Sequence, residues 1–333
     1  AEARDGARLN RYISAEEVAS RLRSMRRGRA PGEDGIPAEL LQKGGVQLLL
    51  ALTELLNACF STGTAPSKFG HALVTMILKP DCEDSDPANY RPISLLSRVG
   101  LAFESVLEHR LSTYTEAWGA EGPTPGHMGV MPDEQGGSRA GRRTAELSST
   151  LTETIKFRAR RNDKTYVAFL DCRKAFDSMY RPAMLVAANT AGVGGRFFAT
   201  LANSYEGVTS AVTVDGATSA SFECLNGLRQ GGILSPIVWA IYLTPLLNEL
   251  RARNLGVELS LVGGESVNVN ALAYVDDIAL VAKDAHNLQL ALDIASRLAN
   301  ELQLTWNAGK CKIVVFGSPP GSQEGRWTVG AGK

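Results

Sequence analysis

Two adjacent aspartates, Asp276 and Asp277, stand between two short apolar segments and are the residues of this chain best suited to chemistry. The flanking residues, 271–275 and 278–282, are rich in strand formers and predict a hairpin with the aspartates at its turn. Turn geometry alone favours Asp at such a tip. The other interpretation is a metal site, because two like charges about 4 Å apart repel by roughly 4 kcal/mol and a divalent cation between them removes that cost.

A third carboxylate is available at Asp171. Residues 166–170 form an apolar run that is too short for a buried helix, so they predict an interior strand ending at this acid. Mg²⁺ prefers oxygen ligands and is often held by one or two carboxylates together with substrate phosphates. Asp171 beside the aspartate pair would therefore suit phosphoryl or nucleotidyl transfer.

Several motifs in this order resemble those of reverse transcriptases. The stretch 169–177 (Phe-Leu-Asp-Cys-Arg-Lys-Ala-Phe-Asp) is similar to the first catalytic motif, and Tyr-Val-Asp-Asp at 274–277 is similar to the second. Residues 226–236 resemble the substrate-binding motif that precedes the long palm helix. With residues 28–37, 89–96 and 307–312, the pattern resembles the non-LTR (LINE-like) retrotransposon branch over about residues 17–317.

The resemblance implies an α+β fold of the right-hand polymerase type. It places the fingers at 1–165 and a palm at 166–317, in which helices back an antiparallel sheet. Residues 318–333 are expected to be a tail or a truncated link to a thumb, since Ser318, Pro319, Pro320 and Gly321 have a loop composition and no thumb would then be present.

The resemblance also assigns the metal ligands. Asp171, Asp276 and Asp277 match the catalytic carboxylates, and the backbone carbonyl of Cys172 matches an assisting ligand. The implied cofactor is a pair of Mg²⁺ ions, with Mn²⁺ as a substitute. The implied partners are an RNA template with a DNA primer, and dNTPs.

Nucleotide-binding roles are carried over in the same way. Phe176 matches an aromatic gate that excludes a 2′-hydroxyl and so selects deoxynucleotides; as an isolated residue it would be a core aromatic. Lys310 matches a lysine that protonates the pyrophosphate leaving group, with Lys312 as a rival. The other matches are the triphosphate-binding Lys79 and Arg91, and Gln230 and Gly231 in the nucleotide pocket.

The chain has no net charge, with 35 basic and 35 acidic residues, which is unusual for an enzyme that binds phosphate backbones. Its charges are nevertheless segregated: arginines gather at residues 21–29 and basic residues at 139–164, whereas the acids of 81–86 form a separate loop. We expect the second cluster, with Arg139, Arg142 and Arg143, to contact the template, although arginine-rich helix faces are often merely solvated. The nearby Gln135-Gly136-Gly137 departs from related enzymes, which commonly have an aromatic residue after the first glycine, so a contact there stays open.

Other classes of protein are disfavoured by composition. The five cysteines are odd in number and lack C-x-x-C spacing, so they predict neither a disulfide framework nor a zinc site. We expect no apolar segment to be long enough for a membrane span, and the charged N-terminus is unlike a signal peptide. We therefore expect an intracellular protein without a membrane partner, and a nuclear one if the chain derives from a eukaryotic retroelement.

The predicted function is an RNA-directed DNA polymerase of a non-LTR retrotransposon that adds dNTPs to a primer 3′-hydroxyl. One alternative is a polymerase-inactive, maturase-like or domesticated RNA-binding protein, which the intact carboxylates oppose. The other is an RNA-directed RNA polymerase, which Phe176 opposes.

Capping residues and apolar periodicity predict the secondary structure. Ser14 predicts a helix start with an apolar stripe at Val18, Leu22 and Met25. Ser235 and Pro236 predict the start of a buried helix. The remaining expected helices are 38–61, 94–114, 144–158, 182–191 and 287–302, and the remaining expected strands are 73–78 and a pair within 208–223.

Overall fold

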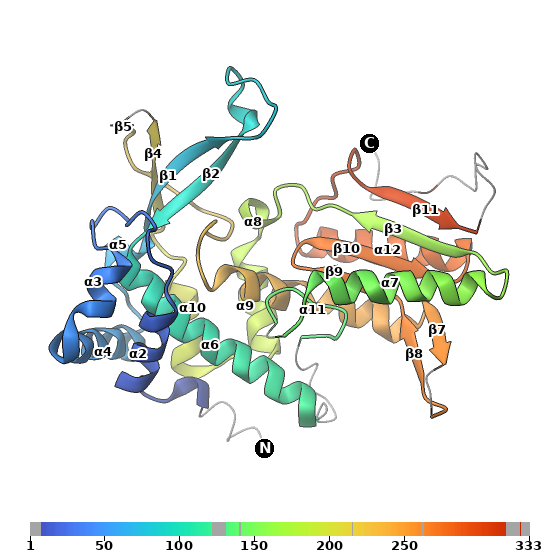
Figure 1. Cartoon of the computed structure of the whole chain (residues 1–333), viewed down its shortest axis with the longest axis horizontal. Helices are drawn as coiled ribbons and strands as arrows, with labels where there is room; N and C mark the ends of the chain where they lie inside the picture. Colours follow the sequence, from blue (N-terminus) through green and yellow to red (C-terminus); the bar gives the residue numbers. More distant parts are fainter. Residues whose placement is uncertain are drawn as a thin grey trace. The chain divides into compact units, whose positions relative to one another are not determined.

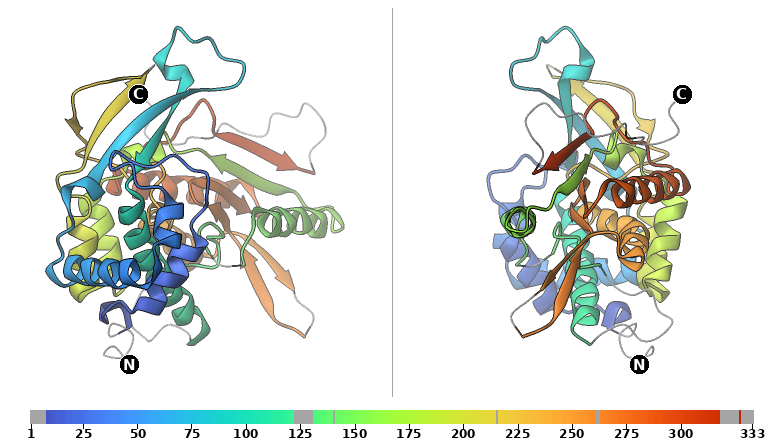
Figure 2. Two further views of the ribbon diagram at one scale, coloured as in Figure 1. Left: turned by 60° about the vertical axis from the view of Figure 1, so that its left-hand side comes forward. Right: turned by 90° about the vertical axis from the view of Figure 1, so that its right-hand side faces the viewer.

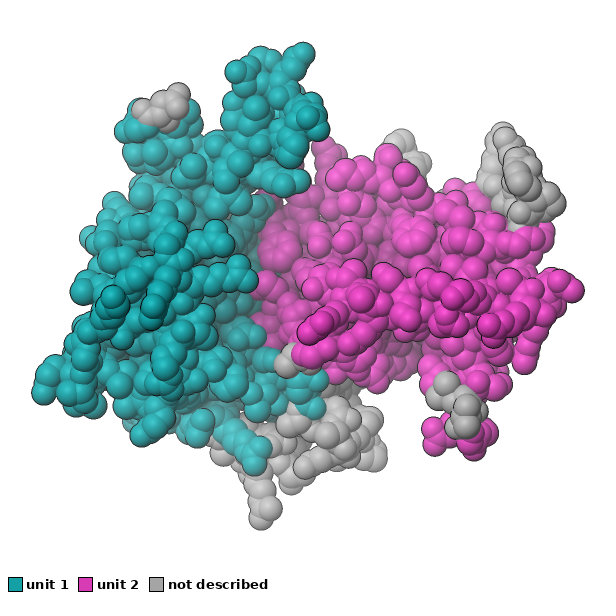
Figure 3. Space-filling model, in the orientation of Figure 1, with its two compact units in different colours: residues 1–117, 188–235 teal, residues 118–187, 236–333 magenta. Residues whose placement is uncertain are grey.

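The computed structural model describes residues 8–121, 131–139, 141–214, 216–260, 263–317 and 327. The chain forms two compact units, each built from two stretches of sequence (Figure 3). Unit 1 contains residues 1–117 and 188–235, and unit 2 contains residues 118–187 and 236–333. The fold is mixed α+β, as expected. The expected boundary between fingers and palm, after residue 165, falls inside unit 2, and the expected tail at 318–333 lies outside the described residues except for Trp327.

Unit 1 combines helices with one sheet of strand order β2-β1-β4-β5, in which β6 also pairs with β4 (Figure 1). Strand β1 is antiparallel to β2 and parallel to β4. The helices are α2 (Ala15–Ser24), α3 (Ala38–Lys43), α4 (Gly45–Thr62), α5 (Ser67–Gly70), the first part of α6 (Arg98–Glu121), the end of α9 (Arg181–Thr190) and α10 (Gly195–Asn203). The strands are β1 (His71–Leu78), β2 (Tyr90–Leu96), β4 (Thr209–Val214), β5 (Ala217–Thr218) and β6 (Phe222–Glu223), with a 3-10 turn η1 (Pro87–Asn89).

Unit 2 is built around an antiparallel sheet of strand order β11-β3-β10-β9. Helix α12 covers one face of this sheet and α7 lies on the other (Figures 1 and 2). The helices are α7 (Thr144–Ala159), α8 (Ala175–Ser178), most of α9, α11 (Ser235–Arg253) and α12 (Ala285–Glu301). The strands are β3 (Thr165–Leu170), β7 (Val257–Ser260), β8 (Ser266–Val269), β9 (Ala271–Tyr274), β10 (Asp277–Ala282) and β11 (Lys312–Phe316).

Local sequence signals explain several element boundaries. The side chain of Ser14 accepts a hydrogen bond from the backbone of Glu17 and caps α2, as predicted. Helix α11 begins at the predicted Ser-Pro pair and buries Trp239, Tyr242 and Leu246 completely. Because it is apolar on every side, this helix has to lie inside the unit.

Two predicted helices differ in the structure. The helix expected at 38–61 is split into α3 and α4, because Gly45 adopts a left-handed φ of 73° and a Cβ on Gly44 would overlap Leu48. The helix expected at 94–114 runs from 98 to 121, since residues 90–96 form strand β2 instead. Pro92 is tolerated there because β2 lies at the edge of its sheet.

Helix α4 also corrects the expectation that no segment reaches the length of a membrane span. By length and composition alone this one described helix could cross a membrane. A single helix of this kind is weak evidence, because helices of soluble proteins can share that composition. Four of its side chains, Leu52, Leu56, Cys59 and Phe60, are buried.

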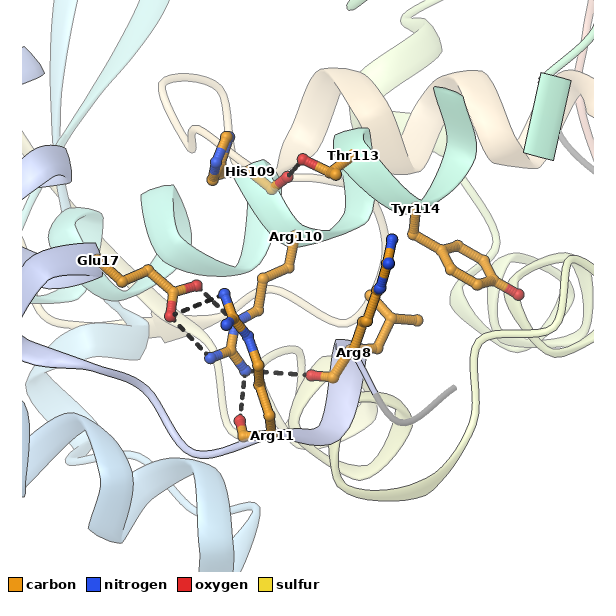
Figure 4. A pocket seen from close by; sticks show the side chains of 8 residues that line it. Arg8, Arg11, Glu17, His109, Arg110, Thr113 and Tyr114 are labelled. Carbon is orange, nitrogen blue, oxygen red and sulfur yellow. Dashed lines mark hydrogen bonds and ion pairs between the residues drawn. The ribbon is translucent and has the colours of Figure 1, made fainter. Parts of the chain in front are cut away.

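The N-terminal segment of unit 1 is fastened to α6 by Arg110 (Figure 4). This side chain bonds the Glu17 carboxylate and the backbone carbonyls of Leu9, Arg11 and Tyr12. A cavity of about 240 Å³ lies beside these bonds, with Tyr114 among its lining residues. The buried guanidinium of Arg110 is therefore paired with a carboxylate and with backbone carbonyls.

Candidate active site

Asp276 and Asp277 lie at the tip of the β9–β10 hairpin in unit 2, so the predicted hairpin is confirmed. Asp277 is the first residue of β10 and pairs with Tyr274, which leaves Val275 and Asp276 as the two turn residues. Val275 has a φ of 59°. The turn thus closes one residue earlier than expected, and the two carboxylates leave the tip from a turn residue and a strand residue.

Asp171 follows the last residue of β3, as predicted. Leu170 is paired with Ile278 on β10, so Asp171 lies at the same end of the sheet as the hairpin tip. Burial raises the pKa of the Asp276 carboxyl, and the charges of Asp277 and Asp171 raise it further, although a backbone hydrogen bond and Lys310 act in the opposite direction. The structure therefore brings the three predicted carboxylates close enough to repel one another.

Lys310 joins this group of acids. Its Nζ lies 3.6 Å from Oδ2 of Asp171, and its side chain is largely exposed. A flexible ammonium in that position partly neutralises the carboxylates and carries a proton that it can donate. Lys312, the rival residue, is the first residue of β11 and pairs with Phe169.

Cys172 is buried directly after Asp171. Burial, followed by the charges of Asp276 and Asp171, raises the pKa of its thiol to about 12. The thiol therefore remains neutral at physiological pH, and the carbonyl oxygen is the group that this residue could offer to a cation.

The donor set fits a hard divalent cation in chemical terms. Among the residues that the structure describes, no group of three His, Cys, Asp or Glu side chains is arranged to hold a metal ion. Carboxylate oxygens are nevertheless the ligands that Mg²⁺ prefers, and substrate phosphates commonly complete its shell. The charge repulsion on Asp276 is the kind of cost that a bound cation relieves.

Phe176 lies in the short helix α8 of unit 2 and is partly buried. Its ring stacks on the fully buried Trp239, with the ring centroids 5.7 Å apart and the planes 15° from parallel. This support fixes one face of the phenyl ring. Trp239 in turn donates its indole N–H to the carbonyl of Val275, 2.9 Å away, so the same residue touches the carboxylate hairpin.

The other nucleotide-binding candidates lie in unit 1. Lys79 and Arg91 are at the same end of the β1–β2 ribbon, because Arg91 pairs with Ile77. Gly231 has a φ of 107°, and a Cβ there would lie 3.0 Å from the carbonyl oxygen of Ser94 on β2. The loop that carries Gln230 and Gly231 therefore runs beside the strand that carries Arg91.

A buried carboxylate that the sequence did not predict holds this loop. Glu104 on α6 pairs with Arg229 at 2.6 Å and accepts a 2.8 Å hydrogen bond from the backbone of Ile233. Ser235 donates its hydroxyl to the carbonyl of Arg229. One signal for Glu104 was present, since it is a lone acid in the apolar run 101–107, and a charge at a core position needs a partner.

The three predicted template contacts have different surroundings in unit 2. The side chain of Arg139 is 5% exposed, and its guanidinium lies 3.5 Å from Asp133. Arg142 also pairs with Asp133, at 3.0 Å, and is partly exposed. Arg143 is exposed at the N-terminus of α7. Arg143 is thus the most accessible of the three, whereas Arg139 is engaged within its own loop.

A cluster of carboxylates at one end of an antiparallel sheet, on a mixed α+β scaffold, defines a polymerase-like protein. In fold, the chain is similar to apo telomerase from Candida tropicalis truncated from its C-terminal domain. The TM-score is 0.53 at 13% sequence identity, and the similarity covers 76% of this chain and 51% of that one. Residues 77–328 match the family model described as reverse transcriptase (RNA-dependent DNA polymerase), and the chain belongs to this family.

Curated relatives support the same family. The chain is 29% identical to the RNA-directed DNA polymerase from mobile element jockey of Drosophila funebris, over 91% of this chain and 32% of that protein. It is 29% identical to the probable RNA-directed DNA polymerase from transposon X-element of Drosophila melanogaster, over 68% of this chain and 24% of that protein. It is 27% identical to the retrovirus-related Pol polyprotein from the type-2 retrotransposable element R2DM of Drosophila melanogaster, over 87% of this chain and 25% of that protein. The predicted resemblance to non-LTR retrotransposon enzymes is confirmed, and the chain spans a quarter to a third of these relatives' length.

Proposed function

We propose that this chain catalyses RNA-directed DNA synthesis, with fingers at 1–165 and a palm at 166–317. The observation that carries the proposal is the meeting of Asp171, Asp276, Asp277 and Lys310 at one end of the unit 2 sheet. Membership of the reverse transcriptase family supports it independently. The substrates that the family implies are a nucleic-acid template with a primer, and dNTPs.

The chemistry requires divalent cations, which the family generally uses. Asp171 and Asp276, assisted by Asp277 and the carbonyl of Cys172, would hold two Mg²⁺ or Mn²⁺ ions. When bound, such ions lower the pKa of the primer 3′-hydroxyl and neutralise the triphosphate. The Nζ of Lys310 lies beside Asp171 and would donate a proton to the departing pyrophosphate.

The nucleotide would be held by the remaining candidates. Lys79 and Arg91 would bind the triphosphate through charge-assisted hydrogen bonds. Gln230 and Gly231 would line the pocket, where the absence of a side chain on Gly231 permits close approach of backbone. The exposed Arg143, with Arg142, would contact the template backbone, and Arg139 would act by shaping the loop that precedes them.

Primer extension on an RNA template tests this function. We expect DNA products with dNTPs in Mg²⁺ and little product with ribonucleotides. Products made only from ribonucleotides would instead indicate an RNA-directed RNA polymerase. RNA binding without any product would indicate a polymerase-inactive RNA-binding protein.

The role of Phe176 can be tested separately. We expect Phe176→Val to raise ribonucleotide incorporation relative to deoxynucleotide incorporation by about tenfold or more, because the clash with a 2′-hydroxyl is lost. The ratio is the appropriate measurement, since loss of stacking on Trp239 also lowers the amount of folded protein. Phe222→Val, at an exposed aromatic on β6, serves as the control. An unchanged ratio for Phe176→Val would make Phe176 a packing residue only.

A further inference from the structure

The turn of the β9–β10 hairpin, which presents Asp276 and Asp277, has a strained backbone. Val275 is its first turn residue and has a φ of 59°, a conformation that is rare for a β-branched side chain. A positive φ at this turn position is normally supplied by glycine. Such strained residues persist only where the surrounding structure enforces them, and they gather at functional sites.

A single side chain bonds both polar backbone groups of this strained residue. The amide of Gln135 is fully buried, and its Oε1 accepts from the N–H of Val275 at 3.0 Å. Its Nε2 donates to the carbonyl of Val275 at 3.3 Å. Oε1 also accepts a 2.8 Å hydrogen bond from the backbone of Gly137, which orients the amide.

The segment that carries Gln135 is itself anchored on two sides. Its backbone forms a parallel bridge with Ala273 of β9. The N–H of Ala273 donates to the carbonyl of Glu134 at 2.7 Å, and the N–H of Gly136 donates to the carbonyl of Ala273 at 2.8 Å. Arg139 bonds the carbonyls of Pro132 and Gln135, and Arg251 on α11 pairs with Glu134. The amide therefore projects from a rigid base.

Gly137 explains why this contact can be so close. A Cβ on Gly137 would lie 2.4 Å from the backbone nitrogen of Val275, so any side chain here would push the turn away. The Gln-Gly-Gly stretch, left open by the sequence as a template contact, instead packs against the hairpin.

We infer that Gln135 is a positioning residue: it holds Val275 in its strained turn and thereby sets the positions of Asp276 and Asp277. An amide can do this because it offers an acceptor to the N–H and a donor to the carbonyl of the same residue. A methionine of similar length offers neither, and an ionised glutamate offers only acceptors. The kinetic part of this inference rests on the proposed polymerase function, whereas the structural part does not.

Gln135→Met tests the inference by kinetics. We expect kcat for dNTP addition to fall by about 10- to 100-fold, because misplaced catalytic groups are costly. The KM for dNTP should stay within about threefold, since no nucleotide-binding group is removed. Leu288→Ala, which opens a cavity on α12 beneath the sheet, is the control for lost stability and should leave kcat per folded molecule unchanged. Equal kcat values for the two variants would overturn the inference.

Hydrogen exchange gives a readout that needs no activity. In Gln135→Met, the amide of Val275 should exchange at least about tenfold faster relative to the amide of Val281, which bonds Asn270 in the same hairpin. Leu288→Ala should leave this ratio unchanged. If the wild-type chain makes no DNA, the proposed function fails, and the exchange ratio still decides whether Gln135 holds the turn. An unchanged ratio of the two exchange rates in Gln135→Met would refute the inference that the Gln135 amide holds Val275.

A second substitution at the turn provides a rescue. Glycine adopts positive φ without strain, so in Val275→Gly the turn should depend less on the hydrogen bonds from the Gln135 amide. In that background the further loss of kcat caused by Gln135→Met should shrink to about fivefold or less. If Gln135→Met alone does not fold, the double variant should fold and add nucleotides. Failure of the double variant, or an undiminished loss in it, would overturn the inference.

Discussion

Asp276→Asn should abolish nucleotide addition, with a loss of more than about 100-fold in kcat, because it removes a ligand of the divalent cations that the proposed reaction requires. Asp171→Asn should behave in the same way. Primer extension under single-turnover conditions measures the effect. Asp293→Asn, which removes an exposed carboxylate from α12 in the same unit, should retain wild-type activity. Near-wild-type extension by Asp276→Asn would show that the proposed site is wrong.

The same substitution should leave the metal-free protein as stable as the wild type or more stable. Burial and the neighbouring Asp277 and Asp171 raise the pKa of Asp276 above its ordinary value of 3.8, so the charged form is disfavoured in the folded state. Folding stability is therefore lost as the pH rises from 3.8, the ordinary pKa of this carboxyl, through its raised pKa in the folded state. The melting temperature of Asp276→Asn should exceed that of the wild type at neutral pH, and the difference should vanish below pH 3.8, where the Asp276 carboxyl is protonated in both the folded and the unfolded state.

The carboxylate hairpin could be predicted because its signals are local. Short apolar segments on both sides of Asp276 and Asp277 specify two strands, and a run ending at Asp171 specifies a third. The exact turn could not be predicted. A valine at a φ of 59° contradicts local preference, and it is held by Gln135 from 140 positions away in the sequence.

Other failures of prediction have either local or distant causes. The split between α3 and α4 depends on the left-handed φ of Gly45, in a Gly-Gly pair that interrupts the apolar pattern. The pairing of Glu104 with Arg229 joins residues 125 positions apart. Strand β2 was predicted in part as helix, because its strand character comes from pairing with β1 and not from its own residues.

Arg110→Met should be among the most destabilising single substitutions in unit 1, at about 3–5 kcal/mol. The side chain of Arg110 is 4% exposed, and its guanidinium bonds both carboxylate oxygens of Glu17, at 2.7 and 2.9 Å. It also bonds three backbone carbonyls of the N-terminal segment, at 2.7 to 3.1 Å, and lies 5.3 Å from the ring centroid of Phe60. Its removal leaves a buried carboxylate and several carbonyls without this partner, which is why the cost is large.

Denaturant unfolding monitored by one probe in each unit measures this cost and that of the control. Arg253→Met is the matched control, because Arg253 pairs with Glu249 one helical turn away and its side chain is 60% exposed. Exposed pairs of this kind contribute about 0.3–0.5 kcal/mol. Arg110→Lys should fall between the two, since a lysine keeps the charge but cannot reproduce the planar set of five donors. Equal losses in Arg110→Met and Arg253→Met would contradict the anchoring role.

The destabilisation should also depend on pH. Burial alone would raise the pKa of Glu17, but its hydrogen bond to Arg110 and the charges of Arg110 and Arg11 outweigh burial and hold that pKa below its ordinary value of 4.5. The ion pair therefore contributes stability above pH 4.5, and this contribution is lost as the pH falls through the lowered pKa of the folded state. The difference in unfolding free energy between the wild type and Arg110→Met should narrow below pH 4.5, while the part that arises from the backbone carbonyls should remain, because carbonyls do not titrate. A difference that stays constant across this range would assign the whole effect to the carbonyls and none to Glu17.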